Sequence, residues 1–290
     1  MIKKHQKIVQ RILVFGALLI FTAQQVYASD KKSVINDRII TTNICIDSLV
    51  VALTGTKNLI AVSALADDSR YSHIRHQVKD IDKVSFNAEL IYALKPSLVL
   101  ASNFSSAKTK FALEKLGVEV QLIDFARSIN DIEKNIQILG RLLNADGRAQ
   151  ELVKLLKSPK VDLNSRKQIV ALQYSTNRYV HGNNSLISDI INRSGFSSYS
   201  KFLGNEKGRY ISAEALVKSA PNVLILDGDK SFNDKSGFPL YHPALMKGKG
   251  KFKALFIETK DWSCGTPKVV DLIIRLNREY IKLVGKNNAT

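Results

Sequence analysis

The residues of this chain that could carry covalent chemistry do not form a recognised catalytic motif. The sequence contains no GxSxG, HExxH, P-loop or GxGxxG pattern, and no spacing of Ser, His and Asp marks a triad. The reactive candidates are two cysteines, Cys45 and Cys264, and the polar and aromatic side chains of loops. We therefore expect a binding protein with no resident cofactor, and not an enzyme.

The two cysteines allow several interpretations. An even count in an exported protein first suggests a disulfide bond. The alternatives are two free thiols at a ligand site, or two unrelated residues. A thiol-dependent enzyme is a weaker alternative, because no activating base stands beside Cys45 or Cys264.

Two histidines, His73 and His76, lie three residues apart in a polar segment. This spacing would suit a metal pair, but the neighbouring Arg70 and Arg75 favour a solvated basic loop. A dedicated zinc or manganese binder would show more clustering of His and carboxylate side chains. We therefore assign no metal site from the sequence.

One sequence pattern occurs twice, 125 residues apart, and reads FNAELIYALKPSLVLA and then ISAEALVKSAPNVLIL. In each copy a capping residue, Asn87 or Ser212, precedes Ala-Glu and a short apolar helix. A proline then ends the helix before a buried strand. The match indicates two similar α/β lobes, each of which presents one glutamate, Glu89 or Glu214, at a helix start.

Strands and helices alternate along the chain, and the strands are short and apolar. This order predicts an α/β fold of two Rossmann-like lobes with mostly parallel sheets. The helical stretch that begins at Ser128, with a break at Asn144, is expected to join the lobes as a long backbone helix. The predicted organisation is a signal peptide (1–28), an N-terminal α/β lobe (29–127), a connecting helix (128–160) and a C-terminal α/β lobe (161–290).

The first 28 residues have the features of a secretory signal peptide. Four Lys and Arg residues precede an apolar run of 11 residues, and Val26-Tyr27-Ala28 resembles a cleavage site. The run is short for a membrane span, which makes an uncleaved anchor the less favoured alternative. Because no cysteine closely follows the run, we expect a soluble periplasmic protein without a lipid anchor.

The remaining chain is strongly basic. Removing the four basic residues of the signal segment from the net charge of +17 leaves +13 for residues 29–290. Nucleic-acid binding is not favoured, because the basic residues are scattered and no binding motif is present. An anionic ligand, a nearby anionic membrane surface, and a lysine-rich composition without specific meaning are the other interpretations.

Loops that follow the predicted strands are expected to form a ligand cleft between the lobes. In parallel α/β sheets, ligands bind beyond the carboxyl ends of the strands. The region between two lobes is also a usual place for a small molecule. Trp262, the only tryptophan, lies on such a loop, where it would supply a flat stacking wall or pack on its lobe.

Four features recur together in one known family. They are the opening Arg38-Ile39-Ile40 strand, the two Glu-to-Pro-to-strand repeats, His181-Gly182 before a helix, and Asp261-Trp262 followed by Pro267 and the last helix. With them the chain resembles, over most of its length, the helix-spined periplasmic substrate-binding proteins of ABC importers for ferric siderophores, haem and cobalamin. The resemblance implies capture of an iron complex, a siderophore complex or haem, and its delivery to an inner-membrane permease dimer with its ATPase.

The resemblance also implies roles for single residues. In that family the glutamate of each repeat docks into arginine pockets of the permease, which assigns docking to Glu89 and Glu214. The segments around both cysteines look like those of iron-complex binders, in which they fall near the cleft. The expected cleft residues are Cys45, Tyr71, Arg178, His181, Tyr210, Trp262 and Cys264, with Arg127 and Arg209 as counter-charges for an anionic chelate.

Several alternatives remain beside this reading of the sequence. Within the same fold they are a cobalamin-binding protein and a metal-ion-binding protein. Outside it they are a secreted thiol enzyme and a structural or adhesive protein without a small ligand. The expected partners are the permease, its ATPase and a small metal complex, with no nucleic acid, and the protein is expected to be a monomer.

Overall fold

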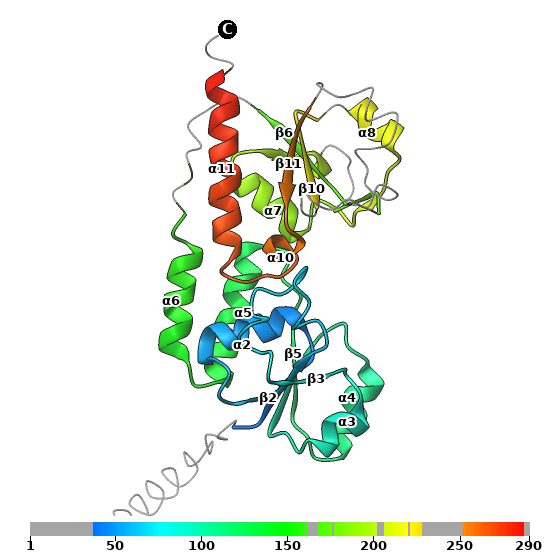
Figure 1. Cartoon of the computed structure of the whole chain (residues 1–290), viewed down its shortest axis with the longest axis vertical. Helices are drawn as coiled ribbons and strands as arrows, with labels where there is room; N and C mark the ends of the chain where they lie inside the picture. The colour runs from blue at the N-terminus through cyan, green and yellow to red at the C-terminus, as the bar shows by residue number, and fades with distance from the viewer. Residues whose placement is uncertain are drawn as a thin grey trace, which may run out of the picture. The chain divides into compact units, whose positions relative to one another are not determined.

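The computed structural model contains two parallel sheets with helices packed against them (Figure 1). It describes residues 37–159, 161, 168–175, 177–201, 206–219, 221–227 and 252–286. These residues belong to one compact unit that begins at Asn36. The predicted signal peptide over residues 1–28 lies outside the described residues.

The first lobe, residues 37–127, is built on a five-stranded parallel sheet with the order β3-β2-β1-β4-β5. Its strands are β1 (Ile39–Thr41), β2 (Leu59–Ser63), β3 (Asp82–Val84), β4 (Leu98–Ser102) and β5 (Val120–Ile123). The central strand β1 is buried at every position. The chain leaves β1 toward one edge and returns at β4 toward the other, so the carboxyl ends of β1 and β4 flank a topological switch point.

Helices cover both faces of this sheet. On one face α2 (Ile44–Thr54) shares a core with Ile39. On the other, α3 (Ala88–Ala93) and α4 (Ala107–Lys115) share a separate core with Ile40. Consecutive residues of β1 enter different cores because side chains alternate across a strand.

The segment that joins the lobes is a helical hairpin. α5 (Ile129–Leu142) ends before Asn144, whose φ of +52° turns the chain into α6 (Asp146–Leu156). The helices run antiparallel, since Lys157 Nζ reaches Glu133 Oε1 at 2.7 Å. A Cβ atom at Gly140 would lie 2.5 Å from the Cβ of Ala149, so the crossing requires glycine there. The break expected at Asn144 is present, and it folds the connecting segment back on itself.

The second lobe, from residue 168 onward, has a four-stranded parallel sheet with the order β11-β10-β6-β8. A small antiparallel pair, β7 with β9, lies beside it. The strands are β6 (Val170–Tyr174), β7 (Tyr179–Val180), β8 (Ser197–Ser198), β9 (Arg209–Tyr210), β10 (Val223–Asp227) and β11 (Lys253–Ile257). The helices are α7 (Leu186–Arg193), η1 (Tyr199–Lys201), α8 (Ala213–Ser219), α10 (Thr259–Trp262) and α11 (Val269–Lys286).

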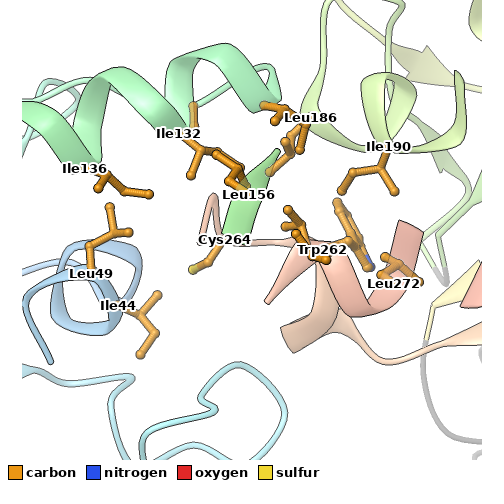
Figure 2. Packing of buried hydrophobic residues seen from close by; sticks show 14 of the residues in the cluster. Ile44, Leu49, Ile132, Ile136, Leu156, Leu186, Ile190, Trp262, Cys264 and Leu272 are labelled. Atoms are coloured by element: carbon orange, nitrogen blue, oxygen red, sulfur yellow. The ribbon is translucent and has the colours of Figure 1, made fainter. Parts of the chain in front are cut away.

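One hydrophobic core runs through both lobes (Figure 2). It joins Leu49 of α2 and Ile136 of α5 to Ile190 of α7 and Leu272 of α11. Trp262 belongs to the same core and is only 8% exposed. Because apolar burial is the main stabilising term in folding, a shared core couples the two lobes energetically.

The predicted α/β class with mostly parallel sheets is confirmed. Strand β3 is a difference, because residues 64–85 were expected to form a loop with at most a short helix. Its three residues become a strand through pairing with β2, which no local pattern reveals. The lobe boundaries at residues 127 and 160 stay predictions, and the short helix expected near Pro243–Met246 lies outside the described residues.

Candidate functional site

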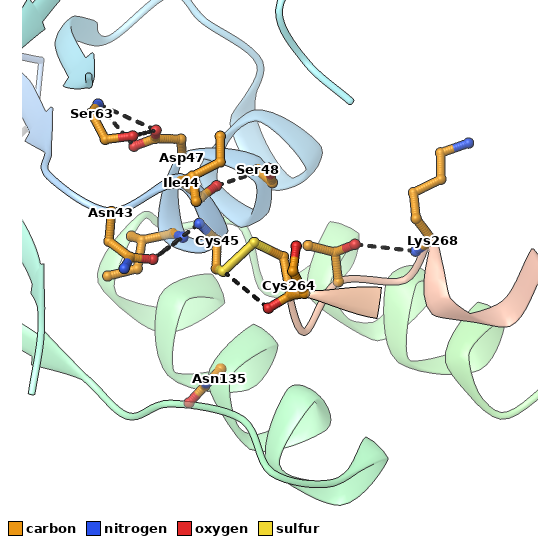
Figure 3. The surroundings of a disulfide bond; sticks show 12 residues. Asn43, Ile44, Cys45, Asp47, Ser48, Ser63, Asn135, Cys264 and Lys268 are labelled. Atoms are coloured by element: carbon orange, nitrogen blue, oxygen red, sulfur yellow. Dashed lines mark hydrogen bonds between the residues drawn. A yellow bond between two sulfur atoms is a disulfide. The ribbon is translucent and has the colours of Figure 1, made fainter. Parts of the chain in front are cut away.

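Cys45 and Cys264 form a disulfide bond between the two lobes (Figure 3). Cys45 lies in the first turn of α2, where the Asn43 side chain caps the helix by accepting from the Cys45 N–H at 3.0 Å. Cys264 follows α10 in the second lobe, and the two Cα atoms lie 4.9 Å apart. Of the interpretations open from the sequence, the structure selects the disulfide, and neither cysteine keeps a free thiol.

Further contacts join the lobes beside this bond. His73 Nε2, from the first lobe, lies 3.2 Å from Asp261 Oδ1 of α10. The Ile129 N–H at the start of α5 donates to Asp189 Oδ2 of α7 at 2.8 Å. At Gly265 a Cβ atom would lie 2.6 Å from the Cβ of Ala126, so these two segments of the chain approach more closely than a larger residue would allow. The two lobes therefore meet at a packed junction, which the disulfide bond links covalently.

An aromatic row, defined as Tyr210, Tyr179, His181 and Trp262, extends along the second lobe. Neighbouring rings meet edge to face, with centroids 5.1 Å apart for Tyr210–Tyr179, 5.0 Å for Tyr179–His181 and 4.9 Å for His181–Trp262. The row begins at Tyr210, which is 71% exposed, and ends at buried Trp262, two residues before Cys264. Burial lowers the pKa of His181, which favours a neutral imidazole that can act as a ligand or acceptor.

A buried polar cluster lies at the carboxyl ends of β6 and β10. The Asp227 carboxylate accepts from Gln173 Nε2 and from Ser175 Oγ, each at 2.8 Å. Burial raises the pKa of Asp227, and the hydrogen bonds from Gln173, Ser175 and Trp262 oppose that rise. The indole N–H of Trp262 lies close enough to contribute, although its geometry falls short of a full hydrogen bond. The cluster thus lies next to Trp262, the buried end of the aromatic row.

A second buried carboxylate lies in the first lobe, two residues after Cys45 (Figure 3). Asp47 of α2 is fully buried and accepts from the backbone N–H and the hydroxyl of Ser63. Burial raises the pKa of Asp47 to about 6, against the opposing hydrogen bonds from Ser63. This carboxylate ties α2 to the end of β2, and so fixes the helix turn that carries Cys45.

The other cleft residues expected from the sequence lie in different surroundings. Tyr71 is half-buried, has the Arg70 guanidinium 5.4 Å from its ring centre, and lines a pocket together with Cys264. Arg178 is exposed with a φ of +68°, directly before the aromatic row's Tyr179. Arg127 and Arg209 are also exposed, the first beside a pocket of the first lobe and the second next to Tyr210. His181, Tyr210 and Trp262 therefore belong to the aromatic row and Tyr71 and Cys264 to one pocket, whereas Cys45 and Arg127 line two other pockets.

Two aromatic residues of the first lobe lie in loops that follow predicted strands, but they were not among the expected cleft residues. Phe104 and Phe125 follow β4 and β5, and their rings meet edge to face with centroids 6.1 Å apart. Both are exposed. Their positions directly after strands beside the topological switch point would have been a sufficient signal.

The repeated glutamates occupy matching places. Glu89 and Glu214 lie in the first turns of α3 and α8, and both are exposed. Asn87 accepts from the Leu90 N–H at 3.0 Å, and Ser212 accepts from the Ala215 N–H at 3.2 Å. The caps that the sequence predicts are thus present in both copies.

The described residues contain neither a metal-binding group of side chains nor a membrane-spanning helix. Within them, no three His, Cys, Asp or Glu side chains are grouped as a metal site. In the same part of the chain, no helix combines the length and the apolar character needed to cross a bilayer.

The chain is similar in sequence to known binding proteins. The sequence matches the periplasmic binding protein family over residues 39–239. A curated relative, the uncharacterized ABC transporter substrate-binding lipoprotein YvrC of Bacillus subtilis (strain 168), is 25% identical over 174 residues, or 53% of this chain and 54% of that protein. The chain thus spans about half the length of the curated relative that it matches.

Solved structures extend the likeness to nearly the whole fold. The periplasmic heme-binding protein RhuT from Roseiflexus sp. RS-1, in apo form, has a TM-score of 0.70 at 16% identity, with 86% of this chain and 99% of RhuT covered. The periplasmic heme-binding protein HutB of Vibrio cholerae has a TM-score of 0.68 at 16% identity, with 84% and 99% covered. At these identities the likeness shows a common fold.

Proposed function

Because the chain belongs to the periplasmic binding protein family, we propose that it is the extracytoplasmic solute-binding component of an ABC importer that captures an iron complex, a siderophore complex or haem. Two observations on relatives support the proposal, the first for the ligand class and the second for the transport role. RhuT and HutB, which share the fold, are described as heme-binding proteins. YvrC is described as an ABC transporter substrate-binding lipoprotein. The protein would act as a carrier without catalysing a reaction.

The aromatic row is the observation that carries the ligand proposal. Flat aromatic ligands stack on Tyr, Trp and His rings, and each ring of the row contacts the next. Arg178 and Arg209 stand one residue before Tyr179 and Tyr210 in the sequence, and both arginines are exposed. Guanidinium groups suit the carboxylates or other anionic groups of an iron chelate. We therefore assign the row and these arginines to the ligand.

The first lobe would supply the opposite wall. Phe104 and Phe125 are exposed aromatic residues at strand ends, which is where ligands of parallel sheets bind. The disulfide restrains the separation of the two lobes, so the ligand would enter a site that is largely formed beforehand. Preorganisation of this kind lowers the ordering cost of binding.

The alternatives are less well supported. A thiol enzyme requires a free thiolate, and both cysteines are in the disulfide. A bare metal ion would need grouped ligands, which the described residues do not provide. Cobalamin, a large flat corrinoid, would use the same aromatic surface, and it is included in the test.

The partners follow from the proposed role. Glu89 and Glu214 would bind arginines of a membrane permease dimer, which an ATPase drives, while the protein itself acts as a monomer. The predicted release into the periplasm after cleavage at Ala28 is part of the same proposal. Because the relative YvrC is a lipoprotein, the intact mass of the exported protein is the measurement that separates a cleaved soluble form from a lipidated one.

Titration of the purified protein tests the proposal. Haemin, a ferric hydroxamate siderophore, a ferric catecholate siderophore and cyanocobalamin are added in turn, and absorbance and Trp262 fluorescence are followed. We expect saturable binding of one iron complex, weakened at least tenfold by Tyr210→Ala. Tyr92→Ala, which removes another exposed tyrosine from α3, is the matched control and should leave affinity unchanged. If none of the four compounds binds, the proposed ligand class is wrong.

A further inference from the structure

A cavity of about 440 Å³ lies among α2, α6 and the turn from α10 to α11, and no residue of the aromatic row lines it. Its walls come from α2 and α6, from the segment Tyr71–Gln77, and from residues Lys260–Asp271. α2 and α6 share the core on one face of the first-lobe sheet, whereas α3 with Glu89 covers the other face. The cavity therefore opens on the side opposite the proposed docking helix, and its size falls within the range of small-molecule sites.

The floor of the cavity is apolar. It is formed by side chains from four parts of the chain: Val51, Ala52, Ile74, Leu152, Leu155, Pro267 and Val270. Leu155 is 48% exposed, although it lies on the hairpin helix α6 beside buried Leu152 and Leu156. Exposed apolar surface in a concave site is characteristic of a place where an apolar group binds.

Three cations surround this floor. Arg148, Lys260 and Lys268 all line the cavity, whereas Asp271 is the single acidic residue among the lining side chains. The acids paired with the other two cations, Glu151 and Glu258, lie outside the lining. The cavity is thus lined by three cations and one acid, Asp271, which is the partner of Lys268.

The existing ion pairs of these cations do not prevent a ligand from binding. Glu151 and Asp271 are largely exposed, and Lys268 Nζ lies 3.6 Å from Asp271 Oδ2. Exposed pairs of this kind contribute little to stability. Arg148 is held in place by its Nε, which donates to the Ala52 carbonyl at 3.1 Å, so its guanidinium is already oriented at the rim. A ligand anion can therefore pair with these groups at small cost.

From this combination we propose a second binding site, for a small amphipathic organic anion with an apolar body and one carboxylate. The apolar body would lie on the Val51–Leu155 floor, and the carboxylate would pair with Lys268 and Arg148. A bare inorganic anion would leave the floor uncovered, and a neutral apolar molecule would not use the cations. The walls belong to both lobes and include Cys264, so an occupant would contact the junction between them.

The probe for this site is octanoate, with 1-octanol as a neutral molecule of the same chain length, and binding to the purified protein is measured by calorimetry. We expect octanoate to bind once per protein and more tightly than 1-octanol. Lys268→Glu should weaken octanoate binding at least tenfold, and Leu155→Arg should remove it because the apolar floor is lost. Asp271→Asn should strengthen it, because it removes the only acidic lining residue. Lys115→Glu makes the same charge change on α4, on the other face of the sheet, and should have no effect.

Each opposite result overturns the proposal. Equal binding of octanoate and 1-octanol would exclude a role for the cations, and unchanged binding in Lys268→Glu and Leu155→Arg would exclude this cavity. Binding of the iron complex is measured in the same variants and should be unchanged. If Lys268→Glu removed octanoate and iron-complex binding together at unchanged thermal stability, there would be a single shared site and no second one. Failure of every iron complex to bind would leave the octanoate result intact, so the two proposals are tested separately.

Discussion

His73 of the first lobe lies 3.2 Å from Asp261 of the second, through Nε2 and Oδ1, and Asp261 also accepts from Arg275 Nη2 at 2.7 Å. Burial alone would raise the pKa of Asp261, but the hydrogen bonds from His73 and Arg275 outweigh it and the pKa is lowered. Asp261 stands three residues before Cys264. A polar contact between the lobes thus lies next to the covalent one.

His73→Ala should destabilise the protein by about 1 kcal/mol at pH 7, since it removes a half-buried hydrogen bond between the lobes. Denaturant unfolding measures the effect. His76→Ala, which changes an exposed histidine in the same segment, is the control and should be neutral. Equal losses in the two variants would mean that the contact with Asp261 has no energetic role.

The lowered pKa of Asp261 also predicts a dependence on pH. A carboxylate with a lowered folded-state pKa stabilises the protein fully above its unfolded-state pKa of about 3.9, and this contribution is lost as the pH falls further. Asp261→Asn removes the contribution. The stability difference between wild type and this variant should shrink as the pH falls below about 4. A difference that does not change with pH would contradict the assignment.

Asp47 predicts the opposite trend, because burial raises its pKa to about 6. The folded state binds the proton more tightly, so protonation stabilises it below the folded pKa, and stability is lost as the pH rises from about 4 through 6. The free energy of unfolding lost in this way is about 3 kcal/mol, because each pKa unit corresponds to about 1.36 kcal/mol. Asp47→Asn keeps an acceptor for Ser63 without the buried charge, so it should match the wild type near pH 4 and exceed its stability at pH 7. A variant that is less stable at both values would show that the carboxylate is needed in its charged form.

Removal of the disulfide should weaken the protein strongly. The bond joins positions 219 residues apart, and the chain-entropy estimate for such a loop is about 5 kcal/mol. The double variant Cys45→Ser/Cys264→Ser should unfold at lower denaturant concentration than the oxidised wild type and at the same concentration as the reduced one. If the reduced wild type unfolds like the oxidised protein, the bond does not contribute to stability.

Glycine at position 265 should be essential for the junction. A Cβ there would lie 2.6 Å from Ala126 Cβ and 2.9 Å from Ile132 Cγ1, so Gly265→Ala should cost about 1–3 kcal/mol through overpacking. Gly147→Ala in α6 meets no atom within 4 Å and should stabilise the helix by up to about 1 kcal/mol. Thermal unfolding of both variants checks the pair, and a neutral Gly265→Ala would mean that the lobes can separate slightly at no cost.

The docking proposal predicts a loss of transport without a loss of binding. Glu89→Lys and Glu214→Lys reverse the charge of exposed residues at two helix starts, so ligand affinity of the purified protein should be unchanged. Uptake of the iron complex by cells should fall in each variant. Glu119→Lys, an exposed acid just before β5, is the control and should transport normally. Normal transport by both docking variants would exclude the assigned role.

The sequence was most informative where structure depends on near neighbours. Asn87 and Ser212 cap their helices as predicted, because a cap involves residues only three positions apart. β3 was missed because a three-residue strand exists only through its partner β2. α6 can fold back on α5 because Gly140 allows Ala149 to approach closely. The pattern of apolar residues along the two helices does not predict this contact.

The candidate site was predictable only in part. Post-strand positions indicated His181 and Trp262, and their rings are in contact. The disulfide remained one of several choices, because pairing depends on a distance between residues 219 positions apart. Tyr71 was grouped with the aromatic row because all were loop residues, but it lines the cavity beside α2 and α6. Which side of a lobe a long loop covers is set by tertiary packing and not by the loop's own sequence.

The position of the two cysteines also determines how the protein must mature. The sheet that positions Cys45 is complete at Ile123, but the thiol has no partner until Cys264 has left the ribosome and the export channel. Oxidation is therefore the last covalent step, made after the N-terminal lobe has had time to fold. Two cysteines permit a single intramolecular pairing, so an oxidase is sufficient and no disulfide isomerase is required. A chain that stops short of Cys264 would keep a free thiol at the start of α2.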